Sequence, residues 1–569
     1  MSFISKAEQL PISRRSLLQV ALSGALLASA SGRALAAMSS PVVKTESGSL
    51  RGETVGSVKR FLGVPYAHSI AGAYRFLPPQ PPQPWDGIRD AVKYADSAPQ
   101  PETELLGRSP VSPAFDPPAY VKSGDDCLAL NIWAPSHANS PRPLPVMVWL
   151  HGGGWVSGSG SCAIYDGEHL AARGDVIVVT INHRLGASGL TDLSRVVGGK
   201  YSESSNLGIR DILAALQWVQ KNISAFFGDP NKVTIFGESG GGWKVATLLG
   251  IPKAKGLFHK AIIQSGPLTR FMEQSEADKV ALTMLEELGI DPALTEAEKE
   301  QALENLSADD VVAAQQRTMA KHPMNMTLPG FPTGFWPVLD NDILPASVFD
   351  PVAAASSLDI PLMIGQNGTE FSLFMLNDKE AYSLDEAGLA ARVGRTFADQ
   401  GEDVAANIIA TYRKDFPDYE PSALWFRIFS DFAMGTLTSR IMDARSVAGA
   451  APVYAYRFDW MSPIADGKLY SPHTMEIPFV FDNVRTRVGE VMTGTDDSRI
   501  RLSKAVSTAW IEFASRGKPA GPGLPAWPVF DRDSRNAMHL DNKSYIAPYI
   551  RPEMLAIYQD KLNKALNGQ

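Results

Sequence analysis

The chain has 569 residues, of which 44% are hydrophobic and 20% charged, and its formal net charge is −8. This composition is typical of a soluble globular protein and excludes collagen-like and intrinsically disordered chains. An acidic chain without a basic stripe is also a poor candidate for nucleic-acid binding, because contacts with phosphate groups need lysine and arginine.

The first 36 residues have the pattern of an export signal. Arg14 and Arg15 precede a short apolar run, and residues 34–36 (Ala-Leu-Ala) offer small side chains for cleavage. Paired arginines at this place indicate the twin-arginine route. We therefore expect residues 1–36 to direct export to the periplasm or medium, and residues 37–569 to form one domain with a net charge of −11. No later apolar run is long enough to span a membrane.

Beyond the N-terminus, apolar and β-branched runs alternate with helical stretches. A helix is predicted over residues 209–223, where apolar residues recur three and four positions apart. Continuous apolar runs are typical of strands buried on both faces, so the alternation indicates an α/β fold with a mainly parallel sheet. Two acidic, helix-prone blocks at 272–320 and 379–447 are expected to be helical cap insertions. The predicted strands contain residues 146–150, 176–181, 233–236, 261–263, 361–364 and 453–456.

A serine lies among glycines directly after the third of these strands. Residues 237–241 (GESGG) match the G-x-S-x-G pattern, and residues 243–249 that follow read as a helix. A nucleophile elbow needs small neighbours, because its serine lies on a strained turn between strand and helix. Ser239 is therefore the predicted nucleophile.

A second glycine-rich segment follows the first predicted strand. Residues 151–155 (HGGGW) are of the HGGG type, which supplies backbone N–H groups to an oxyanion. Gly153 and Gly154 are the predicted donors, and Gly240 would add a third. The two motifs occur in the order typical of α/β serine hydrolases.

A serine nucleophile also needs a histidine base and an acid that orients it. In α/β-hydrolases the three residues occur along the chain in the order serine, acid, histidine. Four histidines lie downstream of Ser239. His473 is the best placed of them, because it follows the last predicted strand on a loop, where catalytic groups are commonly presented. The others are His259, His322 and His539.

Three carboxylates are candidates for the acid that orients this histidine. Glu370 follows the strand predicted at 361–364 and so lies at the favourable end of the sheet. Asp340 also fits by its spacing. Asp359 precedes the strand and lies at the less favourable end. The residues by themselves leave the choice open.

Together these motifs resemble the type-B carboxylesterase and cholinesterase family of α/β-hydrolases, and the resemblance covers essentially the whole chain after residue 36. Residues 125–131 (DDCLALN) are similar to the E-D-C-L-x-L-N signature of that family. Further similar segments are residues 61–67, 151–155, 182–186, 206–208, 227–230, 237–241 and 510–514.

The resemblance implies a serine carboxylesterase that cleaves neutral small-molecule esters through an acyl-enzyme, without a metal or other cofactor. It also implies the acid, because residues 365–371 (GQNGTEF) resemble the segment that carries the family's triad glutamate, which falls on Glu370. His473 precedes E-I-P-F-V-F, and the family histidine precedes a similar run. Two structural ion pairs are implied as well: Arg75 with Asp125, and Arg184 with Asp211.

The chain departs from the family pattern at three places. Gly240 replaces the usual alanine after the nucleophile, and a backbone donor survives that change. Lys244 stands where a small residue is common, and it could either extend to solvent or reach Glu238. The cysteine that usually pairs with Cys127 is replaced near Ala98, so Cys127 and Cys162 are expected not to be joined.

The expected pocket is suited to uncharged groups. Between Ala98 and Asp126 the chain lacks the tryptophan that stacks on quaternary ammonium in cholinesterases. The wall is instead expected to be apolar, so uncharged esters should be preferred to choline esters. The aromatic residues expected in the wall are Trp155, Trp243, Phe335, Trp336 and Phe371.

Replacing Arg14 and Arg15 by lysine tests the export prediction. We expect the double variant to accumulate as active enzyme in the cytoplasm, because the twin-arginine route carries folded protein and reads the arginine pair. Activity assays on cell fractions measure this. Unchanged export of the double variant would refute the prediction.

Overall fold

A computed structural model describes residues 40–102, 109–138, 141–323, 332–401, 403–447 and 449–566. The predicted export signal lies outside these ranges. Within them, no helix is both long and apolar enough to cross a bilayer.

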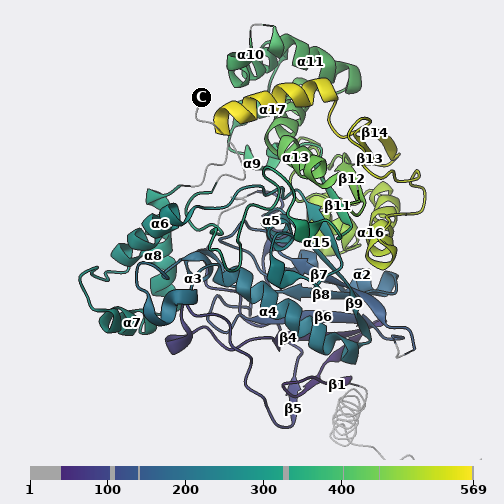
Figure 1. The fold of residues 1–569 in the computed structure, drawn as a ribbon. Coiled ribbons are helices and arrows are strands. Elements are labelled where there is room, and N and C mark those ends of the chain that lie inside the picture. Colours follow the sequence, from purple (N-terminus) through teal and green to yellow (C-terminus); the bar gives the residue numbers. More distant parts are fainter. Residues whose placement is uncertain are drawn as a thin grey trace, which may run out of the picture.

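A large mixed sheet runs through the centre of the molecule (Figure 1). Its middle strands, from β8 through β7 and β9 to β13, are parallel, and antiparallel strands lie at both edges. In spatial order the described strands are β14 (Tyr545–Pro548), β13 (Asn536–Leu540), β12 (Val453–Phe458), β11 (Leu362–Asn367), β10 (Lys260–Gln264), β9 (Gly228–Glu238), β7 (Leu144–Leu150), β8 (Ile177–Ile181), β6 (Ala129–Pro135), β4 (Val58–Pro65) and β3 (Glu53–Val55).

The six predicted strands correspond to β7 through β12, so the α/β fold class is confirmed. The antiparallel edge strands were not predicted. Several of them are short and half exposed, as in β3 and β14, and lack a continuous apolar run. A small separate sheet near the N-terminus consists of β1 (Val42–Lys44), β2 (Ser49–Arg51) and β5 (Ile88–Asp90).

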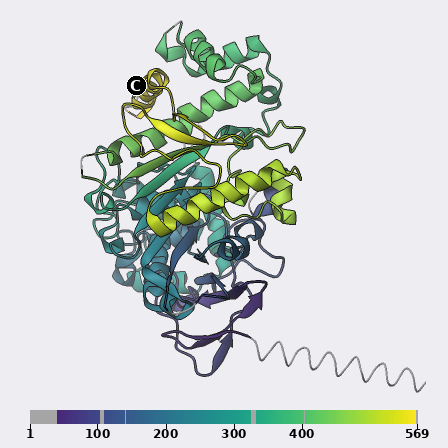
Figure 2. The same ribbon diagram turned by 90° about the vertical axis from the view of Figure 1, so that its right-hand side faces the viewer.

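Helices cover both faces of the sheet. Side chains alternate along a strand, so Val146 and Val148 of β7 face one core and Met147 and Trp149 face the other. The first core includes α4 (Leu207–Asn222) and α5 (Gly240–Leu248), and the second includes α2 (Glu168–Arg173) and α16 (Ser498–Arg516). Figure 2 shows α16 running along its face of the sheet.

The two predicted helical insertions form separate groups (Figure 1). One comprises α6 (Gln274–Glu287), α7 (Glu296–Glu304) and α8 (Ala308–Lys321), which lie beside α3 (Gly186–Leu190). The other comprises α10 (Glu386–Thr396), α11 (Val404–Asp415), α12 (Pro421–Ser430) and α13 (Thr436–Arg445), near the C-terminal α17 (Pro552–Leu566). Three short helices, α9 (Phe371–Phe374), α14 (Ile477–Val480) and α15 (Arg487–Thr493), complete the described α-helices.

Candidate active site

Ser239 occupies the turn between β9 and α5. Its backbone has φ 56° and ψ −123°, a conformation that non-glycine residues rarely adopt. The turn is held in place by a hydrogen bond from the Ser239 N–H to the carbonyl of Gln264 (2.9 Å) and by one from the Trp243 N–H to the carbonyl of Ser239 (3.0 Å). The serine is thus fixed at the N-terminus of a helix, which favours developing negative charge.

The glycines around Ser239 are required by close backbone packing. A Cβ atom on Gly241 would lie 1.9 Å from the carbonyl oxygen of Leu150, at the end of β7, and one on Gly237 would lie 2.6 Å from the same oxygen. A Cβ on Gly240 would lie 2.2 Å from the carbonyl oxygen of Gly154. Any larger residue would therefore push the elbow away from the loop after β7.

The glycines of the HGGG loop, which follows β7, lie beside the turn that carries Ser239. Gly153 and Gly154 both have positive φ, +86° and +61°. The backbone N of Gly154 lies 2.4 Å from the position of a Cβ on Gly240, directly beside Ser239. In the described part of the chain, no acceptor takes the N–H groups of Gly153 and Gly154. Gly240 is the first helical residue, and its N–H has no partner within α5.

A buried histidine and glutamate lie at the carboxyl ends of neighbouring strands. Nδ1 of His473, on the loop after β12, is 2.5 Å from Oε2 of Glu370, which follows β11. Oε1 of Glu370 accepts hydrogen bonds from the Ser265 hydroxyl and the Asn367 N–H, both at 2.6 Å. Glu370 therefore satisfies both of its oxygens while it orients the imidazole.

The alternative candidates lie in other surroundings. Asp340 accepts hydrogen bonds from Ser205 and Asn206 and from the backbone N–H groups of residues 342–344. His539 pairs with Asp459 at 2.6 Å, and His259 and His322 contact Val233 and Thr283 respectively. Among these groups, His473 lines the pocket described below, and Glu370 contacts the far side of its ring at Nδ1.

A second carboxylate, which sequence reasoning did not assign to the site, faces the other nitrogen of His473. Oε1 of Glu238, the residue before Ser239, lies 3.2 Å from Nε2, and in the described structure neither atom has a hydrogen-bond partner. Burial raises the pKa of Glu238 well above its ordinary value, since few donors stabilise its charged form. Burial opposes protonation of His473, but Glu238 and Glu370 outweigh it and raise the pKa of the imidazole.

Lys244 neither extends to solvent nor contacts Glu238, the two outcomes expected from the sequence. Its side chain is 1% exposed, and its Nζ donates to the carbonyl oxygens of His151 (2.9 Å) and Gly154 (3.0 Å) rather than to Glu238. Burial lowers the pKa of Lys244 to about 7. The carbonyls it contacts belong to the two ends of the HGGG loop.

Both ion pairs implied by the resemblance are present. Arg184 forms a two-pronged contact with Asp211 at 2.7 and 2.8 Å, and both side chains are fully buried. Arg75 binds Asp125 in the same way at 2.8 and 3.2 Å. Loss of either partner would leave a buried charge unpaired, which is costly.

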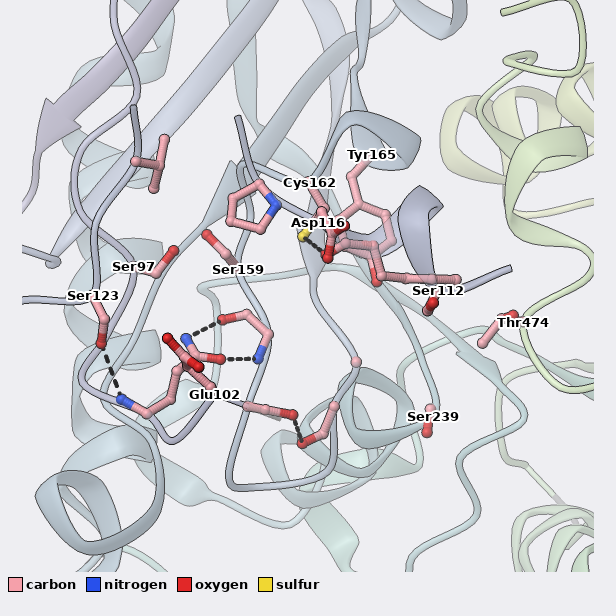
Figure 3. A pocket seen from close by; sticks show the side chains of 18 of the residues that line it. Ser97, Glu102, Ser112, Asp116, Ser123, Ser159, Cys162, Tyr165, Ser239 and Thr474 are labelled. Carbon is pink, nitrogen blue, oxygen red and sulfur yellow. Dashed lines mark hydrogen bonds between the residues drawn. The ribbon is translucent and has the colours of Figure 1, made fainter. Parts of the chain in front are cut away.

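A pocket of about 540 Å³ is lined by Ser239 and His473. Figure 3 shows this pocket, with Ser239 among the labelled residues. Its wall combines rings, hydroxyl groups and a few charges. The aromatic side chains are Phe115, Tyr165 and Phe374, and the charged side chains include Glu102, Asp116 and Lys122. The thiol of Cys162 also faces it and donates to the carbonyl of Phe115 (2.9 Å). Both cysteines are buried as free thiols.

The five aromatic residues expected in the wall do not line this pocket in the described structure. Trp336 packs against both Trp155 and Trp243, with ring centroids 6.4 and 5.1 Å apart. Phe335 and Phe371 are likewise buried in the core on the α5 side of the sheet. The aromatic part of the wall instead consists of Phe115, Tyr165 and Phe374, which are far from Ser239 in the sequence.

Comparison with known proteins decides the family. The carboxylesterase family model matches residues 39–557. The chain belongs to the carboxylesterase family. It is 35% identical over 508 residues to the para-nitrobenzyl esterase of Bacillus subtilis, covering 89% of this chain and 96% of that protein. It is 32% identical to the phenmedipham hydrolase of Pseudarthrobacter oxydans, covering 87% and 93%.

Solved structures of carboxylesterases have the same fold. A para-nitrobenzyl esterase structure is 33% identical, with a TM-score of 0.74, and the match covers 91% of this chain and 99% of that one. A Geobacillus stearothermophilus carboxylesterase is 33% identical, with a TM-score of 0.73, and the match covers 91% and 100%. The chain is thus an α/β-hydrolase and a serine carboxylic ester hydrolase.

Replacing Glu238 by glutamine tests the electrostatics of this carboxylesterase. Removing a carboxylate beside Nε2 lowers the pKa of His473, so more imidazole is neutral, and able to accept a proton, in mild acid. We expect the acid limb of the kcat/KM profile to move about 1 pH unit lower. An unchanged limb, or one moved to higher pH, would contradict the account.

Proposed function

We propose that Ser239, His473 and Glu370 hydrolyse uncharged carboxylic esters through an acyl-enzyme. The observation that carries the proposal is the buried 2.5 Å contact between Glu370 and His473 at the pocket that also contains Ser239. A glutamate so placed fixes the imidazole with Nδ1 protonated, which leaves Nε2 on the side of the pocket to accept a proton.

In the first half of the reaction, Ser239 Oγ attacks the ester carbonyl as its proton passes to Nε2 of His473. The tetrahedral intermediate then collapses, and the C–O bond to the alcohol breaks as the imidazolium returns the proton to the leaving oxygen. In the second half, water attacks the acyl-serine by the same route, releasing the acid and regenerating Ser239.

The oxyanion is assigned to the N–H groups of Gly153, Gly154 and Gly240. Support comes from their position beside Ser239 and from the free N–H groups of Gly153 and Gly154 within the described ranges. Donors fixed in advance are effective because no reorganisation is needed as charge develops, and losing one costs about 10²–10³ in kcat at such sites.

The N-terminal pattern supports the further proposal that the enzyme is exported by the twin-arginine route. The predicted signal and the carboxylesterase domain meet with no intervening segment, since the family match begins at residue 39. The substrate would then be a small ester met in the periplasm or medium.

Substitution of the three proposed catalytic residues tests the mechanism. We expect Ser239→Ala, His473→Ala and Glu370→Gln each to lower kcat about 10⁴-fold or more while the melting temperature stays near that of the parent. The Ser239/His473 double variant should be little worse than either single one, because the residues act as a unit. Asp340→Asn is the matched control. Loss of activity in Asp340→Asn but not in Glu370→Gln would refute the assignment.

A comparison of two esters with the same acyl group tests the substrate class. We expect a short-chain aryl or alkyl ester to have a much higher kcat/KM than the choline ester, because residues 98–126 offer no tryptophan for the ammonium group. The assays belong at physiological salt, where long-range attraction of cations to the acidic protein is weak. A choline ester preferred tenfold or more would overturn the proposal, and amide and carbamate substrates in the same panel define its breadth.

A further inference from the structure

Lys244 is a buried amine that contacts the oxyanion loop. Its Nζ contacts the carbonyl oxygens of His151 and Gly154, the first and last residues of the HGGG segment, and lies 5.5 Å from the ring centroid of Trp155. His151 and His183 are stacked nearby, and burial lowers the pKa of both rings, so they are neutral. Within the described ranges Lys244 forms no ion pair.

We propose that Lys244 is a positioning residue of the oxyanion hole: by holding the carbonyls at both ends of the HGGG loop, it fixes the place of the loop that carries the Gly153 and Gly154 N–H groups. The inference rests on the proposed role of that loop in stabilising the oxyanion. It assigns a function to a side chain that touches neither the pocket nor the reacting atoms.

The planarity of the peptide group explains how carbonyl contacts control N–H directions. In a trans peptide the C=O of one residue and the N–H of the next lie in one plane and point in opposite directions. The Gly152 carbonyl accepts from Nδ1 of His151 (2.9 Å), and the Gly153 carbonyl accepts from the Ser157 N–H (3.1 Å), which orients the N–H groups of Gly153 and Gly154. Lys244 binds the carbonyls of His151 and Gly154, whose peptide planes carry the N–H groups of Gly152 and Trp155, so it anchors the peptide groups on either side of the two donors.

Such anchoring is needed because the loop has little rigidity of its own. Glycine rotates freely at φ and ψ, and three consecutive glycines leave the donors without a fixed direction unless tertiary contacts supply one. A misplacement of about 1 Å at a reacting centre can cost about 100-fold in rate. A single amine that contacts both ends of the loop limits such motion.

The same contact explains why residue 240 is glycine. Gly240 and Lys244 lie four residues apart and so face the same side of α5. A Cβ on Gly240 would lie 2.2 to 2.5 Å from the O, N and Cα atoms of Gly154, the residue whose carbonyl Lys244 binds. The lysine holds Gly154 in the space that a side chain at position 240 would need, so the two residues are coupled.

Lys244→Met tests the inference, because methionine keeps the length of the side chain but has no donor. We expect kcat to fall about 10- to 100-fold, less than the effect of removing an oxyanion donor outright, with KM within about threefold. Affinity for a trifluoromethyl ketone, which forms a tetrahedral oxyanion on serine, should fall by a similar factor. The melting temperature should be unchanged or higher, since replacing a buried charge by an apolar side chain is often neutral or stabilising.

The exposed Lys255, beyond the same helix, provides the matched control, and Lys255→Met should leave all of these quantities unchanged. A kcat of Lys244→Met within twofold of the parent would overturn the inference, as would a loss of kcat matched by loss of folded protein. If Ser239→Ala is inactive while Lys244→Met is fully active, only this inference fails and the proposed function stands.

A double-variant cycle with Gly240→Ala tests the coupling independently. Alone, Gly240→Ala should lower kcat sharply, because its methyl group displaces a Gly154 that Lys244 holds in place. In the Lys244→Met background the loop can move away, so the same change should cost several-fold less. If Lys244→Met does not fold, Lys244→Leu, which also lacks a donor, takes its place. Equal costs of Gly240→Ala in both backgrounds would overturn the coupling.

Discussion

Direct contact between backbones at the turn from β9 to α5 is the constraint on which the rest of the site depends. The end of β7, the start of α5 and the end of β10 meet there with no room for side chains: a Cβ on Gly241 would lie 1.9 Å from the Leu150 carbonyl, and one on Gly266 would lie 2.3 Å from the Ser239 carbonyl. This packing holds Ser239 in a strained conformation that an isolated turn would not keep. It also brings the HGGG loop within reach of the helix that carries Lys244.

The two carboxylates beside His473 differ in ways that suit them to different roles. Glu370 accepts hydrogen bonds from Ser265, Asn367 and His473, which stabilise its charged form despite full burial. Glu238 has an oxygen with no hydrogen bond in the described structure, and its pKa is raised by burial. Glu370 is therefore placed to orient the imidazole and stabilise the imidazolium, whereas Glu238 is a poorly stabilised charge beside Nε2.

The sequence predicted the parts of the site that short segments encode. The strands β7 to β12 are continuous apolar runs, and the elbow and HGGG loop are local glycine patterns, so residues near in sequence were enough to identify them. The acid was not encoded in this way: Glu370 was well placed after a predicted strand, but spacing could not exclude Asp340, and only the resemblance to a family decided between them. The structure shows why Asp340 does not take this role: its carboxylate accepts hydrogen bonds from the Ser205 hydroxyl and from the Ile343 N–H of its own turn.

The pocket wall and the role of Lys244 were beyond the reach of sequence patterns. Phe115 and Phe374 come from loops that lie far apart in the chain, whereas the conspicuous tryptophans near the motifs pack into the core. The sequence could not show which aromatic residues line the pocket and which lie in the core, because large rings are common in both places. Lys244 was recognisable from the sequence as an unusual residue for its position. Its carbonyl partners could not be predicted, because they lie about 90 residues earlier in the chain.

The central claim is that the ester's acyl group passes through Ser239, and trapping of that intermediate tests it most directly. The enzyme would be mixed with p-nitrophenyl acetate, quenched with acid during the burst of nitrophenol release, digested and analysed by mass spectrometry. The account predicts one acetyl group per enzyme molecule, on the peptide that contains Ser239. A burst equal to the enzyme concentration with Ser239 unmodified, or with the acetyl group on another residue, would contradict it.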